Sequence, residues 1–242
     1  PAFGMFLALM WMIFGKTLVV SHLSMLPFVL GAVYFSGKLV RLVVSNRQAW
    51  FWTIVLLGDA AMVTQFTLVS PDVWLLFFFS MAVYAFFDNK RLLLTIAVAG
   101  LTLTSMRGMM MTAALFAAGW IITVFLRREK HLLAVSWAYI RKSFPVYLVP
   151  FLLAAGYLGM HYLQKGWIGY HEDMPWADHF RRSDLSGFLR NGLVLAWRLA
   201  DNGRLLFWIT GIFLVFKWIR IKWQIPVEGK KLMVLITVVL AF

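Results

Sequence analysis

Residues 107–128 read RGMMMTAALFAAGWIITVFLRR, an uncharged run with one arginine before it and two after it. A helix needs roughly 20 mostly apolar residues to cross the hydrocarbon core of a bilayer, which is about 30 Å thick. Backbone N–H and C=O groups in lipid must bond within their own segment, which favours helices, and the apolar runs lack the alternation of barrel strands. Apolar runs predict membrane helices at about 18–37, 50–69, 73–87, 92–106, 109–126, 144–163, 205–219 and 232–242. We therefore predict an all-α, polytopic integral membrane protein with about eight spans.

The composition agrees with this class of protein. Hydrophobic residues make up 62% of the chain, the mean hydropathy is +0.80 and 14% of residues are charged, whereas a soluble domain keeps about 25% charged. A net charge of +13 would suggest nucleic acid for a soluble protein, but these basic residues lie between apolar runs, so no nucleic-acid partner is predicted. The absence of cysteine excludes disulfides. Residues 1–242 are expected to be one transmembrane domain and a fragment of a longer protein, because the chain starts at Pro1 and ends inside an apolar run.

The basic residues also predict which side each loop faces. Cytoplasmic loops collect Lys and Arg, and long translocated segments are exempt from this rule. The opposite short loops hold only Lys16 and Arg107. The turns near residues 70 and 107 and the long loop 164–204 are therefore predicted to be extracytoplasmic. The basic loops hold Lys38, Arg41, Arg47, Lys90, Arg91, Arg127, Arg128, Lys130, Arg141, Lys142, Lys217, Arg220, Lys222, Lys230 and Lys231.

Two segments on the predicted outer side have a further pattern. The chain from Arg91 to Arg127 is shorter than two full crossings and a turn, so the tip near Arg107 should lie at or slightly below the outer surface. In the loop 164–204, apolar residues from Leu185 to Leu199 recur with helical spacing. This spacing predicts an amphipathic helix that lies either on the outer leaflet or against a further extracytoplasmic domain.

The turn Ser70-Pro71-Asp72 has two interpretations. In the structural one, Ser70 caps a helix, Pro71 takes its first position and Asp72 complements the positive end of the helix. In the functional one, Asp72 is a carboxylate held at the membrane surface, where it could bind a divalent metal or an acceptor.

Two more ionisable residues are candidates. Asp59 falls near the middle of a predicted span, where a charged group is costly, and Gln65 follows on the same helix. Asp59 is either functional or hydrogen-bonded between helices. Arg107 is the lone basic residue on a short outer turn. Its guanidinium could bind the phosphate of a lipid headgroup, or it could extend to water.

The long outer loop is rich in aromatic, acidic and histidine side chains. Aromatic rings and carboxylates are the groups that sugar recognition uses, so this loop could contact a sugar or an acceptor. A solvated loop is the alternative, and the spacing fits no standard metal-ligand pattern. The candidates are His171, Glu172, Asp173, Trp176, Asp178 and His179.

The order of these features resembles that of the GT-C membrane glycosyltransferases, the class of the protein O-mannosyltransferases and the lipid A aminoarabinose transferase. Pro1-Ala2-Phe3-Gly4 and the apolar run to Lys16 resemble a segment after the first outer loop of that class. The run from Ser70 to Leu76 resembles its second acidic turn, and Leu101 to Gly108 resembles a later hairpin with a basic tip. A large outer loop follows, here 164–204.

The resemblance implies transfer of a sugar from a polyprenyl-phosphate donor on the extracytoplasmic side, in a bacterial inner membrane. It implies a principal catalytic carboxylate upstream of this chain, Asp72 as a catalytic residue holding a divalent metal or the acceptor, and Arg107 as the group that neutralises the lipid phosphate. The sugar and the acceptor stay undefined. A transporter or flippase that uses Asp59, or a non-catalytic membrane subunit, are the alternative functions.

Overall fold

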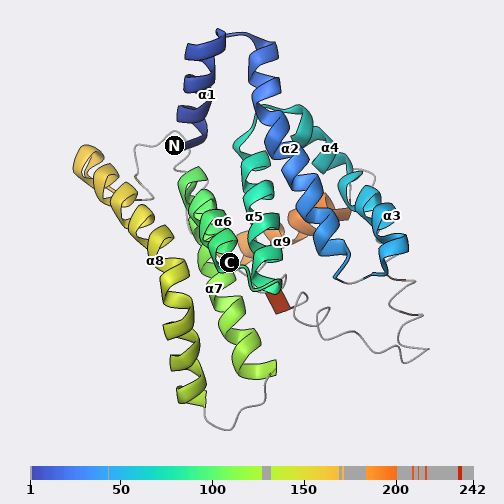
Figure 1. The fold of residues 1–242 in the computed structure, drawn as a ribbon, viewed down its shortest axis with the longest axis vertical. Helices are drawn as coiled ribbons and strands as arrows, with labels where there is room; N and C mark the ends of the chain where they lie inside the picture. Colours follow the sequence, from blue (N-terminus) through green and yellow to red (C-terminus); the bar gives the residue numbers. More distant parts are fainter. Residues whose placement is uncertain are drawn as a thin grey trace. The chain divides into compact units, whose positions relative to one another are not determined.

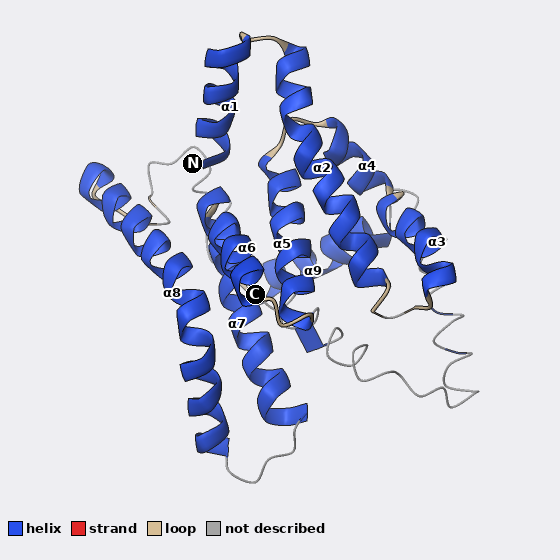
Figure 2. Ribbon diagram, in the orientation of Figure 1, coloured by secondary structure: helices blue, strands red, loops and turns tan. Residues whose placement is uncertain are grey.

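The computed structural model describes residues 2–42, 44–126, 132–168, 171, 184–200, 209, 212, 216, 234 and 235. Every regular element within these residues is a helix (Figure 2). The all-α prediction is therefore confirmed over the described part of the chain. Three described helices are long and apolar enough to cross a membrane, as judged by length and composition. The number of about eight spans stays a prediction, since the runs 205–219 and 232–242 lie almost wholly outside the described residues.

The described helices follow one another along the chain in Figure 1. Their bounds are α1 Ala2–Phe14, α2 Leu18–Val40, α3 Asn46–Leu57, α4 Ala60–Thr67, α5 Pro71–Phe87, α6 Arg91–Thr104, α7 Met106–Leu126, α8 Leu132–Lys165 and α9 Leu185–Ala200. The chain divides into two compact units. The larger comprises Pro1–Gly58, Met62–Ala155 and Ile225–Phe242, and the smaller comprises Asp59–Ala61 and Gly156–Gln224.

The core of the larger unit is formed around α5, which packs against α2 and α6, while α7 packs against α6. Alanines lie where these helices approach one another: Ala82 and Ala85 on α5, Ala97 on α6 and Ala118 on α7 are fully buried. Small side chains allow the close backbone approach that stabilises helix pairs in lipid, where the hydrophobic effect adds little. α5 is thus the central helix of the larger unit.

α2 and α5 run parallel to each other. The ring of Phe28 contacts Trp74 and Phe77, and the ring of Phe35 contacts Phe77 and Tyr84. Residue numbers on α2 and on α5 therefore increase in the same direction along the pair. With a rise of 1.5 Å per residue, this register places the first turn of α2 about 10 Å beyond the first turn of α5. The connection between α1 and α2 accordingly extends past the start of α5 (Figure 1).

The prediction of one continuous helix over 50–69 is wrong. α3 ends at Leu57 and α4 begins at Ala60, with Gly58 and Asp59 between them. Glycine is unfavourable inside a helix, and Asp prefers helix starts to helix interiors. Asp59 therefore lies at a break between two short helices, not in the middle of a long one.

The predicted span 144–163 is the later part of a much longer helix. α8 has 34 residues and begins at Leu132. The charge pattern predicts Arg141 and Lys142 in a loop, but both lie inside α8, because Arg and Lys favour helices and their charges mark no helix end. The other predicted bounds agree with α2, α5, α6 and α7 to within a few residues, and α9 lies where the amphipathic pattern predicts a helix.

Candidate functional site

Asp72 lies in the first turn of α5, and the preceding residues fix its position. The N–H of Asp72 donates to Ser70 Oγ over 3.1 Å, and the Ser70 hydroxyl lies 3.3 Å from Asp72 Oδ2. Ser70 has the extended backbone of an N-cap residue, and Pro71 takes the first helical position, where its lack of an N–H costs nothing. The predicted helix cap is confirmed. Because the carboxylate is 40% exposed, it remains open to further partners.

Arg107 lies in the first turn of α7, directly after a tight hairpin. Ser105 alone links α6 to α7, and its oxygens accept hydrogen bonds from the N–H groups of Gly108 and Met109. Gly108 lies so close to the carbonyl oxygen of Leu101 that a Cβ would overlap it. A glycine at this position allows the two helices to meet at the tip. Arg107 is thereby held at the end of the hairpin, with its side chain 78% exposed.

The structure brings Asp72 and Arg107 together. Arg107 Nη1 lies 3.4 Å from Asp72 Oδ1, although the residues are 35 positions apart in the sequence. A single long contact between exposed groups contributes at most about 1 kcal/mol. The negative charge of Asp72 is favourable at the positive N-terminus of α5, whereas the positive charge of Arg107 is unfavourable at the N-terminus of α7. One carboxylate therefore offsets the charge of a guanidinium and of two helix N-termini, and the place favours an additional anion.

A second ion pair lies at the other end of α5. Lys90 Nζ lies 2.8 Å from Asp88 Oδ2, and the Tyr84 hydroxyl donates to the same oxygen over 2.8 Å. The hydrogen bond from Lys90, followed by that from Tyr84, holds the pKa of Asp88 below its usual value. The charge of Lys38 also acts on Asp88. Lys38 and Lys90 therefore share one end of the helix bundle, opposite the Asp72–Arg107 pair, and the side of the membrane that each end faces stays a prediction.

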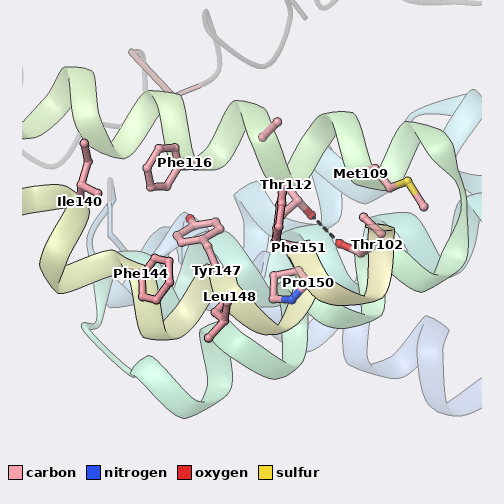
Figure 3. A pocket seen from close by; sticks show the side chains of 12 residues that line it. Thr102, Met109, Thr112, Phe116, Ile140, Phe144, Tyr147, Leu148, Pro150 and Phe151 are labelled. Atoms are coloured by element: carbon pink, nitrogen blue, oxygen red, sulfur yellow. Dashed lines mark hydrogen bonds between the residues drawn. The ribbon is translucent and has the colours of Figure 1, made fainter. Parts of the chain in front are cut away.

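An apolar cavity of about 400 Å³ lies between α6, α7 and α8 (Figure 3). On α7 its wall begins at Met109, one position beyond Gly108, and continues through Thr112 to Phe116. The hydroxyls of Thr102 and Thr112 bond to backbone carbonyls, so they do not require a ligand. The Tyr147 hydroxyl is buried and has no hydrogen-bond partner among the described residues. The cavity thus starts near the residue that carries the guanidinium and is lined almost wholly by hydrocarbon.

The remaining predicted site residues lie elsewhere or outside the described part. Gln65 is on α4, and its Oε1 is buried without a hydrogen-bond partner among the described residues. His171 stacks near Trp167, with ring centroids 5.6 Å apart, and Trp167 contacts His161. Five predicted loop residues lie outside the described residues, namely Glu172, Asp173, Trp176, Asp178 and His179.

The described residues offer little to a metal ion at Asp72. The neighbours of its carboxylate are the Ser70 hydroxyl and the Arg107 guanidinium, and a divalent cation takes several oxygen ligands. No group of three His, Asp or Glu side chains converges anywhere in the described ranges. The predicted divalent metal therefore stays a prediction.

Sequence reasoning missed the surroundings of Trp74. Its ring is 7% exposed and packs on Phe3, Phe6 and Phe28, yet its Nε1–H has no hydrogen-bond partner among the described residues. The contacts come from α1 and α2, far away in the sequence. The local signal in the sequence is the position of Trp74, two residues after Asp72.

No family model matches the chain, and no curated protein or solved structure matches it. The resemblance to the GT-C enzymes rests on the short motifs quoted above. The observations that bear on function are therefore the geometry of the Asp72–Arg107 pair and its position in the helix bundle.

Proposed function

We propose that this chain belongs to a membrane glycosyltransferase that moves a sugar from a polyprenyl-phosphate donor to an acceptor on the extracytoplasmic side. The observation that carries the proposal is the 3.4 Å contact between Arg107 and Asp72. Sequence reasoning selected these residues separately, one for a lipid phosphate and one for the acceptor side of the reaction. Their contact at one end of the bundle agrees with a shared role.

Arg107 would stabilise the leaving group. In an inverting transfer, the acceptor oxygen attacks the anomeric carbon and loses its proton to a carboxylate. The bond from that carbon to the phosphate oxygen breaks, and its electron pair remains on the lipid phosphate. A guanidinium has five N–H donors, and the contact with Asp72 engages one terminal nitrogen. Arg107 therefore keeps donors for the phosphate, and the N-termini of α5 and α7 add positive potential.

Asp72 would position Arg107 and the acceptor. Its own location is fixed by the Ser70 cap, so a contact with its carboxylate restrains the long arginine side chain. The resemblance assigns the proton-accepting carboxylate to the chain upstream of residue 1. Asp72 then lies where an acceptor hydroxyl could donate a hydrogen bond to its exposed Oδ atoms.

The apolar cavity supports a lipid-linked donor in preference to a soluble nucleotide sugar. It lies between three helices of the larger unit and begins at Met109, beside the turn that holds Arg107. The prenyl chain of a lipid-linked donor could occupy this cavity while its phosphate lies at Arg107. A nucleotide would require polar groups to recognise its base and ribose, and the cavity lining does not offer them.

The test is sugar transfer from a polyprenyl-phosphate donor by the full-length protein. We expect Arg107→Ala to lower kcat by about 100- to 1,000-fold, as for the loss of one transition-state donor. Arg107→Lys should restore part of the rate, and Asp72→Asn should also impair transfer. The matched controls are Lys90→Ala and Asp88→Asn, which remove the ion pair at the other end of α5. Wild-type rates in folded Arg107→Ala and Asp72→Asn proteins would disprove the site.

Transport is a second candidate, favoured by the break between α3 and α4. Discontinuous helices with polar groups at the break are typical of transporter binding sites, and Asp59 lies at this one. If the protein is a transporter or flippase, substrate flux into proteoliposomes should be lost in Asp59→Asn and kept in Arg107→Ala. The opposite pattern, or no flux in the wild type, would exclude this function.

A further inference from the structure

The helix α9 begins through interactions within its own first turn. Asp184 caps it: the N–H of Gly187 donates to Asp184 Oδ1 over 2.8 Å, and the Phe188 N–H donates to the Asp184 carbonyl over 2.9 Å. The carboxylate also complements the positive end of the helix. The sequence thus specifies a helix here without relying on distant contacts for its start.

Large apolar side chains of α9 are exposed. The exposed fractions are 76% for Leu185, 68% for Phe188, 58% for Leu189 and 73% for Leu193. At 100° per residue these four positions fall within one arc of the helix, while Arg190 lies outside it. A contiguous apolar face of this kind indicates a surface that binds something apolar.

We propose that α9 lies in the membrane–water interface, with this apolar face in the acyl region of the bilayer. Its charge supports a lipid partner: Leu185 to Ala200 contains arginines at 190 and 198 and no acidic residue. Basic residues opposite an apolar face bind anionic headgroups, whereas a helix that docks on a protein needs no such charge. Trp197, which is 69% exposed, adds the residue type that collects at membrane interfaces.

The end of the preceding helix has the same character. The last turns of α8 expose Met160 and Leu163, with exposed fractions of 62% and 85%. Just beyond them are Lys165 and the ring of Trp167, which makes an edge-to-face contact with His161, with centroids 4.6 Å apart. Apolar turns followed by a basic and an aromatic side chain mark a helix that leaves the bilayer.

The chain between α8 and α9 cannot cross the membrane again. Residues 166–184 include acidic, basic and histidine side chains and contain no apolar run of membrane length. α9 must therefore lie on the same side of the bilayer as the end of α8. The leaflet that we assign to α9 is thus the one that surrounds the last turns of α8.

Residues 1–242 contain no cysteine, so a cysteine introduced into this chain can be labelled on its own. Leu193→Cys places a single thiol on the apolar face, and Asn191→Cys places one on the polar face as the matched control. Each is labelled with an environment-sensitive fluorophore in vesicles that contain anionic lipid. We expect emission from residue 193 at shorter wavelength and strong quenching by spin-labelled acyl chains. Residue 191 should emit as in water and be quenched by an aqueous agent.

Two results would overturn the proposal. Equal, water-like emission from both positions would show that α9 lies in solvent. Short-wavelength emission from residue 193 without quenching by lipid would show that a protein surface, from a further domain or a second copy, covers the face. Leu189→Cys tests the same face if the Leu193 variant does not fold. Arg190→Glu should shift residue 193 toward water-like emission in anionic vesicles but not in neutral ones.

Discussion

Gly108→Ala is expected to disrupt the α6–α7 hairpin and to lower the free energy of unfolding by more than about 4 kcal/mol, the range reserved for severe backbone conflicts. A Cβ on residue 108 would overlap the carbonyl oxygen of Leu101, which is backbone and cannot rotate away. The helices would have to separate at their tip, and Arg107 would move with them. The protein is unfolded in mild-detergent micelles by adding a denaturing detergent, and unfolding is followed by circular dichroism. This titration measures the decrease in the free energy of unfolding.

The control for this prediction is the same substitution at an open glycine. A Cβ on Gly159 meets no atom within 4 Å, and the residue lies inside α8. Gly159→Ala should therefore stabilise the protein slightly, by at most about 1 kcal/mol of helix propensity. If both variants changed stability by the same amount, the close approach at Gly108 would have no energetic weight.

Trp74→Ala is expected to cost about 3–5 kcal/mol, the usual loss for removing a large buried aromatic ring. Trp74 joins three helices, because its ring packs on Phe6 of α1 and Phe28 of α2. The centroids of Trp74 and Phe28 are 4.5 Å apart. Alanine would leave a cavity at the start of α5, next to Asp72. The same unfolding measurement applies, and the variant should also lower the proposed sugar transfer.

Trp74→Phe separates packing from hydrogen bonding at this position. Phenylalanine keeps a ring and removes the Nε1–H, which has no hydrogen-bond partner among the described residues. Its stability should therefore be much closer to wild type than that of Trp74→Ala. An equal loss in both variants would mean that the indole N–H, and not the ring contacts, stabilises the start of α5.

The elements that sequence reasoning located well are those with strong local signals. Ser70, Pro71 and Asp72 specify the start of α5, and the uncharged run after Arg107 specifies α7. Hydropathy marks where a chain leaves lipid, but not where a helix ends. For this reason the start of α8, on the far side of Arg141, was not predicted. The α3–α4 break is not evident from hydropathy because apolar residues continue on both sides of Gly58 and Asp59, so the run has the hydropathy of one long segment.

The site was only partly predictable for a related reason. The charge pattern assigned Asp72 and Arg107 to the same side, and their residue types suggested an acceptor and a phosphate. Their 3.4 Å contact depends on the packing of α5, α6 and α7, which local sequence does not specify. The aromatic contacts of Trp74 depend in the same way on α1 and α2.

The offset between α2 and α5, together with their different lengths, affects the thickness of bilayer that the protein requires around it. α2 has 23 residues and α5 and α6 have 17 and 14, which correspond to about 35, 25 and 21 Å. A hydrocarbon core of about 30 Å matches neither group, and hydrophobic mismatch is relieved by local thinning or by helix tilt. Lipid beside α6, which exposes Leu92, Ile96 and Leu103, should thin toward Arg107, whereas lipid beside α1 and α2 need not. The protein would then distort one leaflet next to the Asp72–Arg107 pair, and the proposed sugar transfer would vary with the acyl-chain length of the membrane that holds it.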